Sequence, residues 1–418
     1  MTDSRVSWFV GVLFVGATAV FVQSVSADDW PGWRGPERTD ISKETGLLKK
    51  WPAEGPKRVW LNENAGLGYS GVSVVDGRLF TLGARDDAEQ LICLDAATGE
   101  EKWVTPLGPI LGNKWGNGPR GTPTVDGTRV YAMGGTGHLI CVQIEDGKKL
   151  WNAEMSELGG GKPNWGYCES VLVDGPRVVC TPGGSEGAIA ALNKETGEVL
   201  WRSTELTNGA QYASIIPAVL HDQAQYIQLF QSELAAVSPE DGRLLWKTSW
   251  PGKTAVIPTP IVSADHVFVT SGYGVGCMLV KIDADNKPEE VYFNKNMKNH
   301  HGGVLLLGEH LYGHSDGVGW TCLDFKTGEI VWNERGALGK GCVTYADGML
   351  YCVDEGSGEV ALVEASPNGW NEQGRFKLTP QTTQRSPSGR IWTHPVVSNG
   401  KLYLRDQDLL FCYDVKAE

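Results

Sequence analysis

The chain has no excess of basic residues. Its 37 lysines and arginines stand against 50 aspartates and glutamates, which gives a net charge of −13. A nucleic-acid partner needs a basic face for its phosphates, so this composition argues against such a partner. No run of like charge is long enough to form a charged tail. The acidic balance therefore indicates solubility and leaves the function open.

The sequence also lacks a helical period. Its apolar residues alternate in short runs that are bounded by turn residues, as half-buried β-strands require. Beyond the N-terminal segment, no apolar run reaches the roughly 20 residues that a membrane-spanning helix needs. These patterns predict an all-β protein, and no composition change marks a second domain.

Residues 1–27 resemble a secretory signal peptide. Arg5 supplies a positive start, residues 8–22 form an uncharged apolar run, and Val25-Ser26-Ala27 places small residues before Asp28. We expect cleavage there and export to the periplasm, the cell surface or the medium. No cysteine near this position could be lipidated. The alternative is an uncleaved anchor, and membrane association is expected only in that case.

One sequence unit recurs about eight times. Its clearest form is a Thr-Gly-Glu turn followed by tryptophan, as in residues 95–103, 193–201 and 324–332. Tryptophans that end successive units lie 43, 48, 50 and 45 residues apart. A period of roughly 40–50 residues built from strands predicts a β-propeller. The tryptophans expected to dock one blade on the next are Trp60, Trp103, Trp151, Trp201, Trp246 and Trp332.

Each unit reads as four antiparallel strands. In the first unit, the turn at Asp76-Gly77 joins the first two strands. First strands recur at Gly71, Thr122, Ser170, Ile216, Thr259, Gly303, Cys342 and His394. The last unit has only three strands, so we expect residues 57–61 to complete it and close an eight-bladed ring. The predicted organisation is a signal peptide (1–27), an N-terminal strap (28–56) and one propeller domain (57–418).

Nine cysteines in an exported chain suggest disulfides. The strand register favours another role, because Cys93, Cys141, Cys322 and Cys412 occupy the same third-strand position. That position suits a small buried residue, which a free cysteine can be. We therefore expect mostly packing cysteines, although the sequence does not decide whether any of them pair.

The Thr-Gly-Glu-x-x-Trp turns resemble the docking repeats of the pyrroloquinoline quinone (PQQ)-like β-propeller superfamily, over roughly residues 57–418. This superfamily includes the quinoprotein alcohol dehydrogenases and a non-catalytic outer-membrane assembly lipoprotein. Residues 29–36 (DWPGWRGP) resemble the start of secreted, planctomycete-type members. The resemblance implies the fold and export. Those dehydrogenases carry a vicinal disulfide above the quinone, and this sequence has no Cys-Cys pair, so no catalytic residue is carried over.

The loops that precede the first strands share one face of a propeller, and here they are rich in aromatic and polar residues. Convergent groups of this kind are the usual sign of a binding site. The candidates are Tyr69, Trp115, Arg120, Trp165, Tyr167, Glu169, Gln211, Tyr212, His300, His301, Trp392 and His394. The tryptophans suit stacking on a planar quinone or a sugar, and Arg120 suits a carboxylate. Glu169, Asn117 and Asn164 offer oxygen ligands for calcium.

Three functions follow from these residues. The first is an exported binding or scaffold propeller that contacts an envelope protein or a glycan. The second is a quinoprotein-like dehydrogenase that oxidises an alcohol or sugar with PQQ and calcium, with His300, His301 or His394 as a general base. The third is a hydrolase or lyase on a propeller. The histidines lack partners at zinc-binding spacing, and fold alone cannot choose among these functions.

Overall fold

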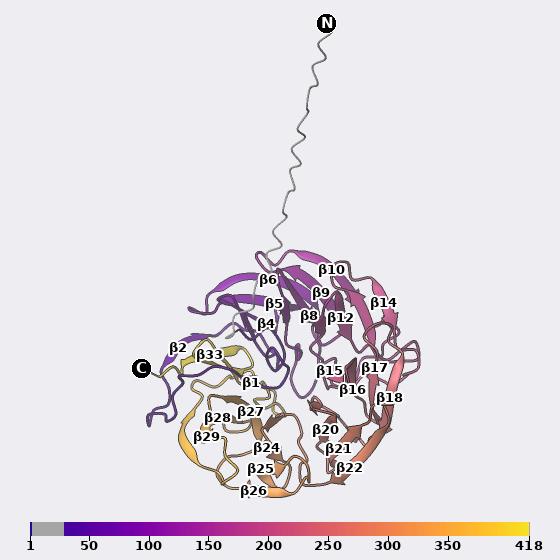
Figure 1. Ribbon diagram of the computed structural model, residues 1–418. Coiled ribbons are helices and arrows are strands. Elements are labelled where there is room, and N and C mark those ends of the chain that lie inside the picture. The colour runs from indigo at the N-terminus through magenta and orange to yellow at the C-terminus, as the bar shows by residue number, and fades with distance from the viewer. Residues whose placement is uncertain (2–28, 418) are drawn as a thin grey trace.

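The computed structural model describes residues 1 and 29–417, so residues 2–27 of the predicted signal segment lie outside the described residues. Eight sheets are arranged in a ring around a central channel (Figure 1). The predicted eight-bladed β-propeller is confirmed. Each first strand begins at or close to the predicted position, because the alternating apolar runs are buried between neighbouring sheets.

The first four blades follow one another along the chain, each with antiparallel strands in sequence order. Blade 1 comprises β3 (Ser73–Val75), β4 (Arg78–Arg85), β5 (Ala88–Asp95) and β6 (Glu101–Pro109), and blade 2 comprises β7 (Thr124–Asp126), β8 (Arg129–Met133), β9 (His138–Gln143) and β10 (Lys149–Glu154). Blade 3 comprises β11 (Leu172–Asp174), β12 (Arg177–Cys180), β13 (Ala190–Asn193) and β14 (Val199–Arg202), and blade 4 comprises β15 (Ile216–Leu220), β16 (Gln223–Leu229), β17 (Glu233–Val237) and β18 (Leu244–Ser249).

The remaining blades complete the ring. Blade 5 comprises β19 (Ile261–Ser263), β20 (His266–Ser271), β21 (Gly276–Ile282) and β22 (Pro288–Asn294), and blade 6 comprises β23 (Val304–Leu307), β24 (His310–Ser315), β25 (Gly319–Asp324) and β26 (Ile330–Glu334). Blade 7 comprises β27 (Gly341–Ala346), β28 (Met349–Asp354), β29 (Glu359–Glu364) and β30 (Glu372–Lys377), and blade 8 comprises β31 (Val396–Ser398), β32 (Lys401–Asp406), β33 (Leu409–Asp414) and β2 (Arg58–Asn62). Because β2 pairs antiparallel with β33, the predicted closure by an N-terminal strand is confirmed.

Tryptophans link successive blades. The indole N–H groups donate to a backbone carbonyl of the next blade, from Trp60 to Ala96 (3.0 Å), Trp103 to Ile144 (3.1 Å), Trp151 to Lys194 (2.9 Å), Trp201 to Pro239 (2.9 Å) and Trp332 to Ser366 (2.9 Å). A turn glycine lies against most of these rings. At Gly242, for example, φ is +73° and a Cβ would stand 2.4 Å from the Trp201 ring. The turn glycine therefore leaves room for the tryptophan.

Blade 4 departs from this arrangement. Trp246 donates to the Gln225 side chain of its own blade at 2.6 Å. The following blade has no glycine in the corresponding turn, residues 283–287, so the turn has no surface free of a side chain on which the indole could pack. In blade 5 a tyrosine takes the docking position, and the Tyr292 hydroxyl donates to the carbonyl of Phe325 at 3.0 Å.

Residues 29–56 form a segment that we call the strap, of which residues 30–42 lie in the central channel and the rest runs to the outer strand β30 of blade 7. A short strand of the strap, β1 (Ile41–Ser42), pairs parallel with the inner strand β27. Hydrogen bonds connect the strap to the inner strands or loops of seven blades through Trp30–Val74, Pro31–Val125, Arg38–Ser170, Trp33–Thr259, Arg34–Val304, Asp40–Tyr345 and Asp40–His394. The channel is therefore occupied by the chain's own N-terminal segment.

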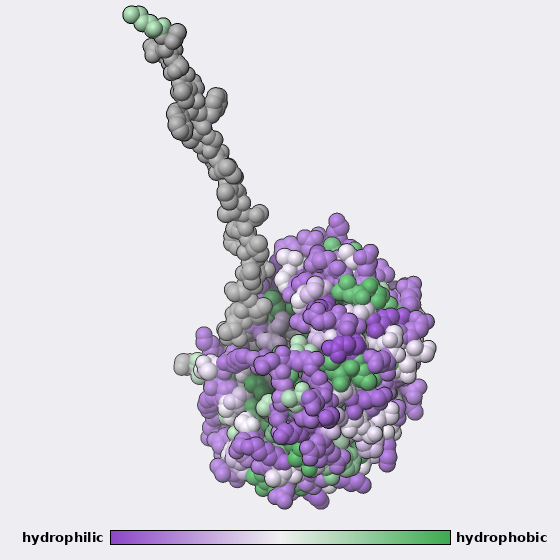
Figure 2. All heavy atoms as spheres, turned by 45° about the vertical axis from the view of Figure 1, so that its right-hand side comes forward, coloured by the Kyte–Doolittle hydropathy of each residue, from purple (hydrophilic) through white to green (hydrophobic). Residues whose placement is uncertain are grey.

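All nine cysteines are free, eight are buried and Cys168 is half-buried. In the described part of the chain, no helix is long and apolar enough to cross a membrane. The face shown in Figure 2 is mostly hydrophilic with scattered apolar patches, in keeping with the acidic composition.

Candidate functional site

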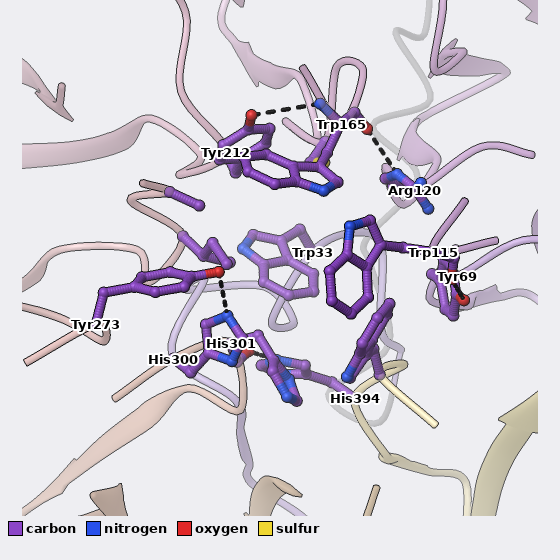
Figure 3. A pocket seen from close by; sticks show the side chains of 14 residues that line it. Trp33, Tyr69, Trp115, Arg120, Trp165, Tyr212, Tyr273, His300, His301 and His394 are labelled. Carbon is purple, nitrogen blue, oxygen red and sulfur yellow. Dashed lines mark hydrogen bonds between the residues drawn. The ribbon is translucent and has the colours of Figure 1, made fainter. Parts of the chain in front are cut away.

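A cavity of about 200 Å³ opens where the inter-blade loops meet, and we call it the cup (Figure 3). The loops before each first strand lie on the same face as the turns between second and third strands, because the strands of a blade are antiparallel. Nine of the twelve predicted candidates line the cup: Tyr69, Trp115, Arg120, Trp165, Tyr212, His300, His301, Trp392 and His394. The loops thus bring together residues up to 325 positions apart.

The aromatic walls of the cup are inclined to one another. The rings of Tyr69 and Trp392 lie 4.9 Å apart at 43°, and those of Trp115 and Trp392 lie 6.4 Å apart at 48°. Across the cup, Trp165 and Tyr212 meet edge to face at 68°. Such tilted pairs are favoured by the ring quadrupoles. They form a concave apolar surface and offer no parallel pair of rings.

Arg120 is the permanent cation of the cup. Its guanidinium lies over the Tyr69 ring at 5.1 Å and donates to the carbonyls of Trp165 (2.7 Å) and Gly116 (3.0 Å). The third nitrogen, Nη1, has no hydrogen-bond partner among the described residues. Within that same part of the chain, Arg120 forms no salt bridge, although its charge acts on the buried Glu89 carboxylate from beyond ion-pair distance.

His300 belongs to a directed chain of hydrogen bonds. The Lys340 ammonium, paired with Asp316 at 3.0 Å, donates to Nδ1 of His300 at 2.7 Å. An ammonium can only donate, so the imidazole proton must be on Nε2. That nitrogen lies 2.8 Å from the Tyr273 hydroxyl. Burial, with the nearby charges of His301 and Lys340, lowers the pKa of His300 to about 3 and keeps the ring neutral.

His301 is held as a cation in the lining of the cup. Burial opposes its charge, but Cys342 and Glu355 outweigh burial and raise the pKa of His301 to about 9. Nε2 of His301 bonds the Glu355 carboxylate, which also accepts from the Trp392 indole at 2.9 Å. Nδ1 lies 3.6 Å from the Cys342 thiol. Burial alone would raise the pKa of this thiol, but His394 and His301 lower it to about 7.

His394 connects the cup to the strap. Its Nδ1 lies 3.1 Å from Asp40, and its Nε2 lies 2.8 Å from the carbonyl of His301. Burial opposes the charge on the ring, but Cys342 and Asp40 raise the pKa of His394 to about 10. Asp40 also pairs with Arg34 at 2.6 Å, and both side chains are only 2% exposed. All three histidines of the cup therefore have both ring nitrogens in hydrogen bonds.

The other three predicted candidates lie outside the cup lining. The Tyr167 hydroxyl is buried and donates to the carbonyl of Pro182 at 3.0 Å. The buried Glu169 carboxylate accepts from the backbone and hydroxyl of Thr181, and burial raises its pKa to about 7. Gln211 accepts from the backbone N–H of Val256 at 3.3 Å. Each of these three side chains makes contacts within the loop layer.

Five cup residues were absent from the predicted set: Trp33, Cys168, Ala255, Ile257 and Tyr273. Tyr273 lies in the turn between β20 and β21, and the antiparallel order of strands within a blade would have placed it on the cup face. Trp33 belongs to the strap, where no repeat indicates a position. Cys168, Ala255 and Ile257 carry no chemical signal in the sequence.

The cup fits PQQ with calcium poorly. An apolar cavity of roughly 150 Å³ holds one benzene ring, so a cup of about 200 Å³ suits one substituted ring better than three fused rings. The proposed calcium ligands are not brought together, because Glu169 binds Thr181 and the Asn117 side chain accepts from Asn113. Among the described residues, no group of three or more histidine, cysteine or acidic side chains is placed to hold a metal ion.

Comparison with known proteins identifies related sequences. The model of a family described as Outer membrane protein assembly factor BamB matches residues 44–159 and 109–334. Outer membrane protein assembly factor BamB of Shewanella oneidensis is 23% identical over 163 residues, which are 37% of this chain. The match spans 40% of the length of that curated relative.

Solved structures share the architecture. BamB from Moraxella catarrhalis superposes with a TM-score of 0.61 at 15% identity, over 86% of this chain and 98% of that one. A quinohemoprotein alcohol dehydrogenase from Comamonas testosteroni superposes with a TM-score of 0.63 at 11% identity, over 94% of this chain and 81% of that one. At these identities the likeness extends to the fold alone.

Proposed function

The chain belongs to the family described as Outer membrane protein assembly factor BamB, and on that premise we propose that it is an exported binding module of the cell envelope. The name of the family supports the envelope, and the signal-like residues 1–27 support export. In this proposal the ligand site is the cup, and the propeller is the rigid frame that positions its loops.

One observation carries the proposal: the loops converge on an aromatic cup that is backed by the strap. Trp33 of the strap lines the cup from the channel side, so the cavity has a floor made by the chain itself. A concave, mostly aromatic cavity with a few polar groups is the usual form of a small-ligand site. A plugged channel without such a cavity would have favoured purely structural loops.

The same geometry favours binding over alcohol oxidation. A general base must reach the proton that it removes. The ring nitrogens of His300, His301 and His394 are all engaged with neighbouring residues. The poor fit of PQQ and calcium points the same way, so the dehydrogenase stays the alternative to be tested.

The purified full-length chain can be tested on an array of envelope glycans and peptidoglycan fragments. The double variant Trp115→Ala/Trp165→Ala removes two cup walls, and Phe293→Ala removes an exposed ring from the outer strand β22 as a matched control. We expect wild type and the control to bind the same array members and the double variant to bind none. Array binding that survives in the double variant, or none with the wild type, would contradict the proposal. Calcium-dependent PQQ binding in calorimetry would favour the dehydrogenase.

A further inference from the structure

The polar side chains that face the cup are mainly donors. The indole N–H groups of Trp115 and Trp165 have no acceptor among the described residues, and Figure 3 shows both rings at the cavity. The Tyr212 hydroxyl accepts from the backbone N–H of Trp165 at 3.4 Å, which leaves its own proton free to donate. A ligand in the cup therefore meets several hydrogen-bond donors.

Tyr273 adds a donor whose direction is fixed. Because Lys340 donates to Nδ1 of His300, Nε2 of that ring donates to the Tyr273 hydroxyl. The hydroxyl proton must then point away from His300. Tyr273 is 40% exposed, and Figure 3 shows its hydroxyl directed toward the middle of the cup. The chain of hydrogen bonds thus ends in an O–H group that can donate only to a ligand or to water, and not to His300.

Among the residues that the structure describes, no carboxylate lines the cup, although the chain contains 50 acidic residues. The acids next to cup residues are engaged, since Glu355 binds His301, Asp40 binds Arg34, and Asp316 near Tyr273 pairs with Lys340. Arg120 brings an unpaired positive charge to the wall. Aromatic cages commonly bind cations, but this local charge disfavours an ammonium ligand and favours an anion.

The shape of the cup favours a non-planar ring. Its volume of about 200 Å³ is only slightly larger than that of a cavity of roughly 150 Å³ that encloses benzene. A flat aromatic ring binds best between parallel faces, whereas the cup walls meet at 43°, 48° and 68°. Inclined aromatic side chains can instead contact the C–H groups on several sides of a puckered ring. A saccharide ring combines such faces with acceptor oxygens.

We propose that the cup binds one six-membered sugar ring that carries an anionic group, a carboxylate or a sulfate ester. This inference rests on the proposed binding function and names its ligand class. The anionic oxygens accept from the Tyr273 hydroxyl and the indoles and lie in the field of Arg120. A neutral hexose brings more hydroxyl protons, for which the cup side chains offer few acceptors, and an unpaired buried polar group weakens binding.

The test compares D-glucose with D-glucuronate and D-glucose 6-sulfate. These two anionic sugars differ from glucose only at the sixth carbon. Benzoate is included as a planar anion. Binding to the full-length chain is followed by saturation-transfer NMR and tryptophan fluorescence. We expect both anionic sugars to bind at least about tenfold more tightly than glucose, the effect of one charge-assisted hydrogen bond. Tyr273→Phe should weaken the anionic sugars about tenfold, while Tyr345→Phe, outside the cup, should leave them unchanged.

Each result separates the two proposals. Equal binding of glucose and glucuronate, or an unchanged affinity in Tyr273→Phe, would overturn the anionic ligand and leave the binding module intact. Binding of benzoate alone would overturn the sugar ring. If no probe binds while the glycan array is positive, the ligand class is wrong and the module stands. If the array is also negative, both proposals fail.

Discussion

Replacement of Trp201 by alanine should destabilise the propeller by about 3–5 kcal/mol, the range for large aromatic truncations in cores. Only 9% of this residue is exposed, and its ring stacks on Tyr226 with ring centroids 6.3 Å apart and an interplanar angle of 27°. Burial of roughly 200 Å² of a tryptophan at about 25 cal/mol per Å² gives about 5 kcal/mol, which agrees with that range. The lost hydrogen bond to the Pro239 carbonyl accounts for about 1 kcal/mol of the total.

Guanidinium denaturation followed by circular dichroism measures this loss. Trp201→Phe retains a ring on Gly242 but loses the N–H group, so we expect a smaller cost of about 1–2 kcal/mol. Trp115→Ala, which removes a half-exposed ring from the cup, is the matched control and should cost under about 1 kcal/mol. A free energy of unfolding for Trp201→Ala within about 1 kcal/mol of the wild type would refute the docking argument.

Three further predictions concern the contacts of the strap and the closure of the ring by β2. Asp40→Asn leaves the buried Arg34 and His394 cations uncompensated and should cost about 3–5 kcal/mol in the same assay; an unchanged value would show that this pair is not a stabilising contact. The raised pKa of His394 contributes stability that is complete below its ordinary value of 6.5 and is lost as the pH rises through about 10. The raised pKa of His301 contributes stability that is lost in the same way up to about pH 9, whereas the lowered pKa of Cys342 contributes stability that is gained above about pH 7. The two histidine losses together exceed the cysteine gain, so the free energy of unfolding should fall between pH 7 and 10, and less steeply in His394→Gln. A flat wild-type profile would contradict this. Deletion of residues 57–62 removes β2 and exposes the edge of β33, so light scattering should detect aggregation; a soluble, folded truncation would exclude the closure role.

The fold was predictable because the information is local and repeated. In four blades the turn glycine lies against the tryptophan of the preceding blade, and Gly328 lies against Tyr292 in the same way, so sequence and packing repeat with one period. At Gly197, with φ of +78°, a Cβ would stand 2.8 Å from the Trp151 ring. Where the turn lacks glycine, at residues 283–287, Trp246 turns to its own blade. The local rule thus accounts for both the pattern and its exception.

The cup was predictable in position and only partly in composition. The inter-blade loops had to share a face, which brought Trp115, Trp165 and Trp392 together. The direction of a side chain within an irregular loop has no such rule. Trp165 faces the cavity, while Tyr167, two residues later, turns inward to the carbonyl of Pro182. Strand alternation would have placed both on one side, but this segment is not a strand.

The strap explains why blade sequences alone say little about the ligand. Its contacts are long-range: Arg34 donates to Val304 and Arg38 to Ser170, at separations of 270 and 132 residues, and no local pattern encodes such partners. Yet the strap supplies Trp33 to the cup, and its Asp40 joins Cys342 in raising the pKa of His394. Propellers of similar fold include an assembly factor and an alcohol dehydrogenase. Because the blades are common to both, we infer that the chemistry of this cup depends on the strap and the loops that it anchors.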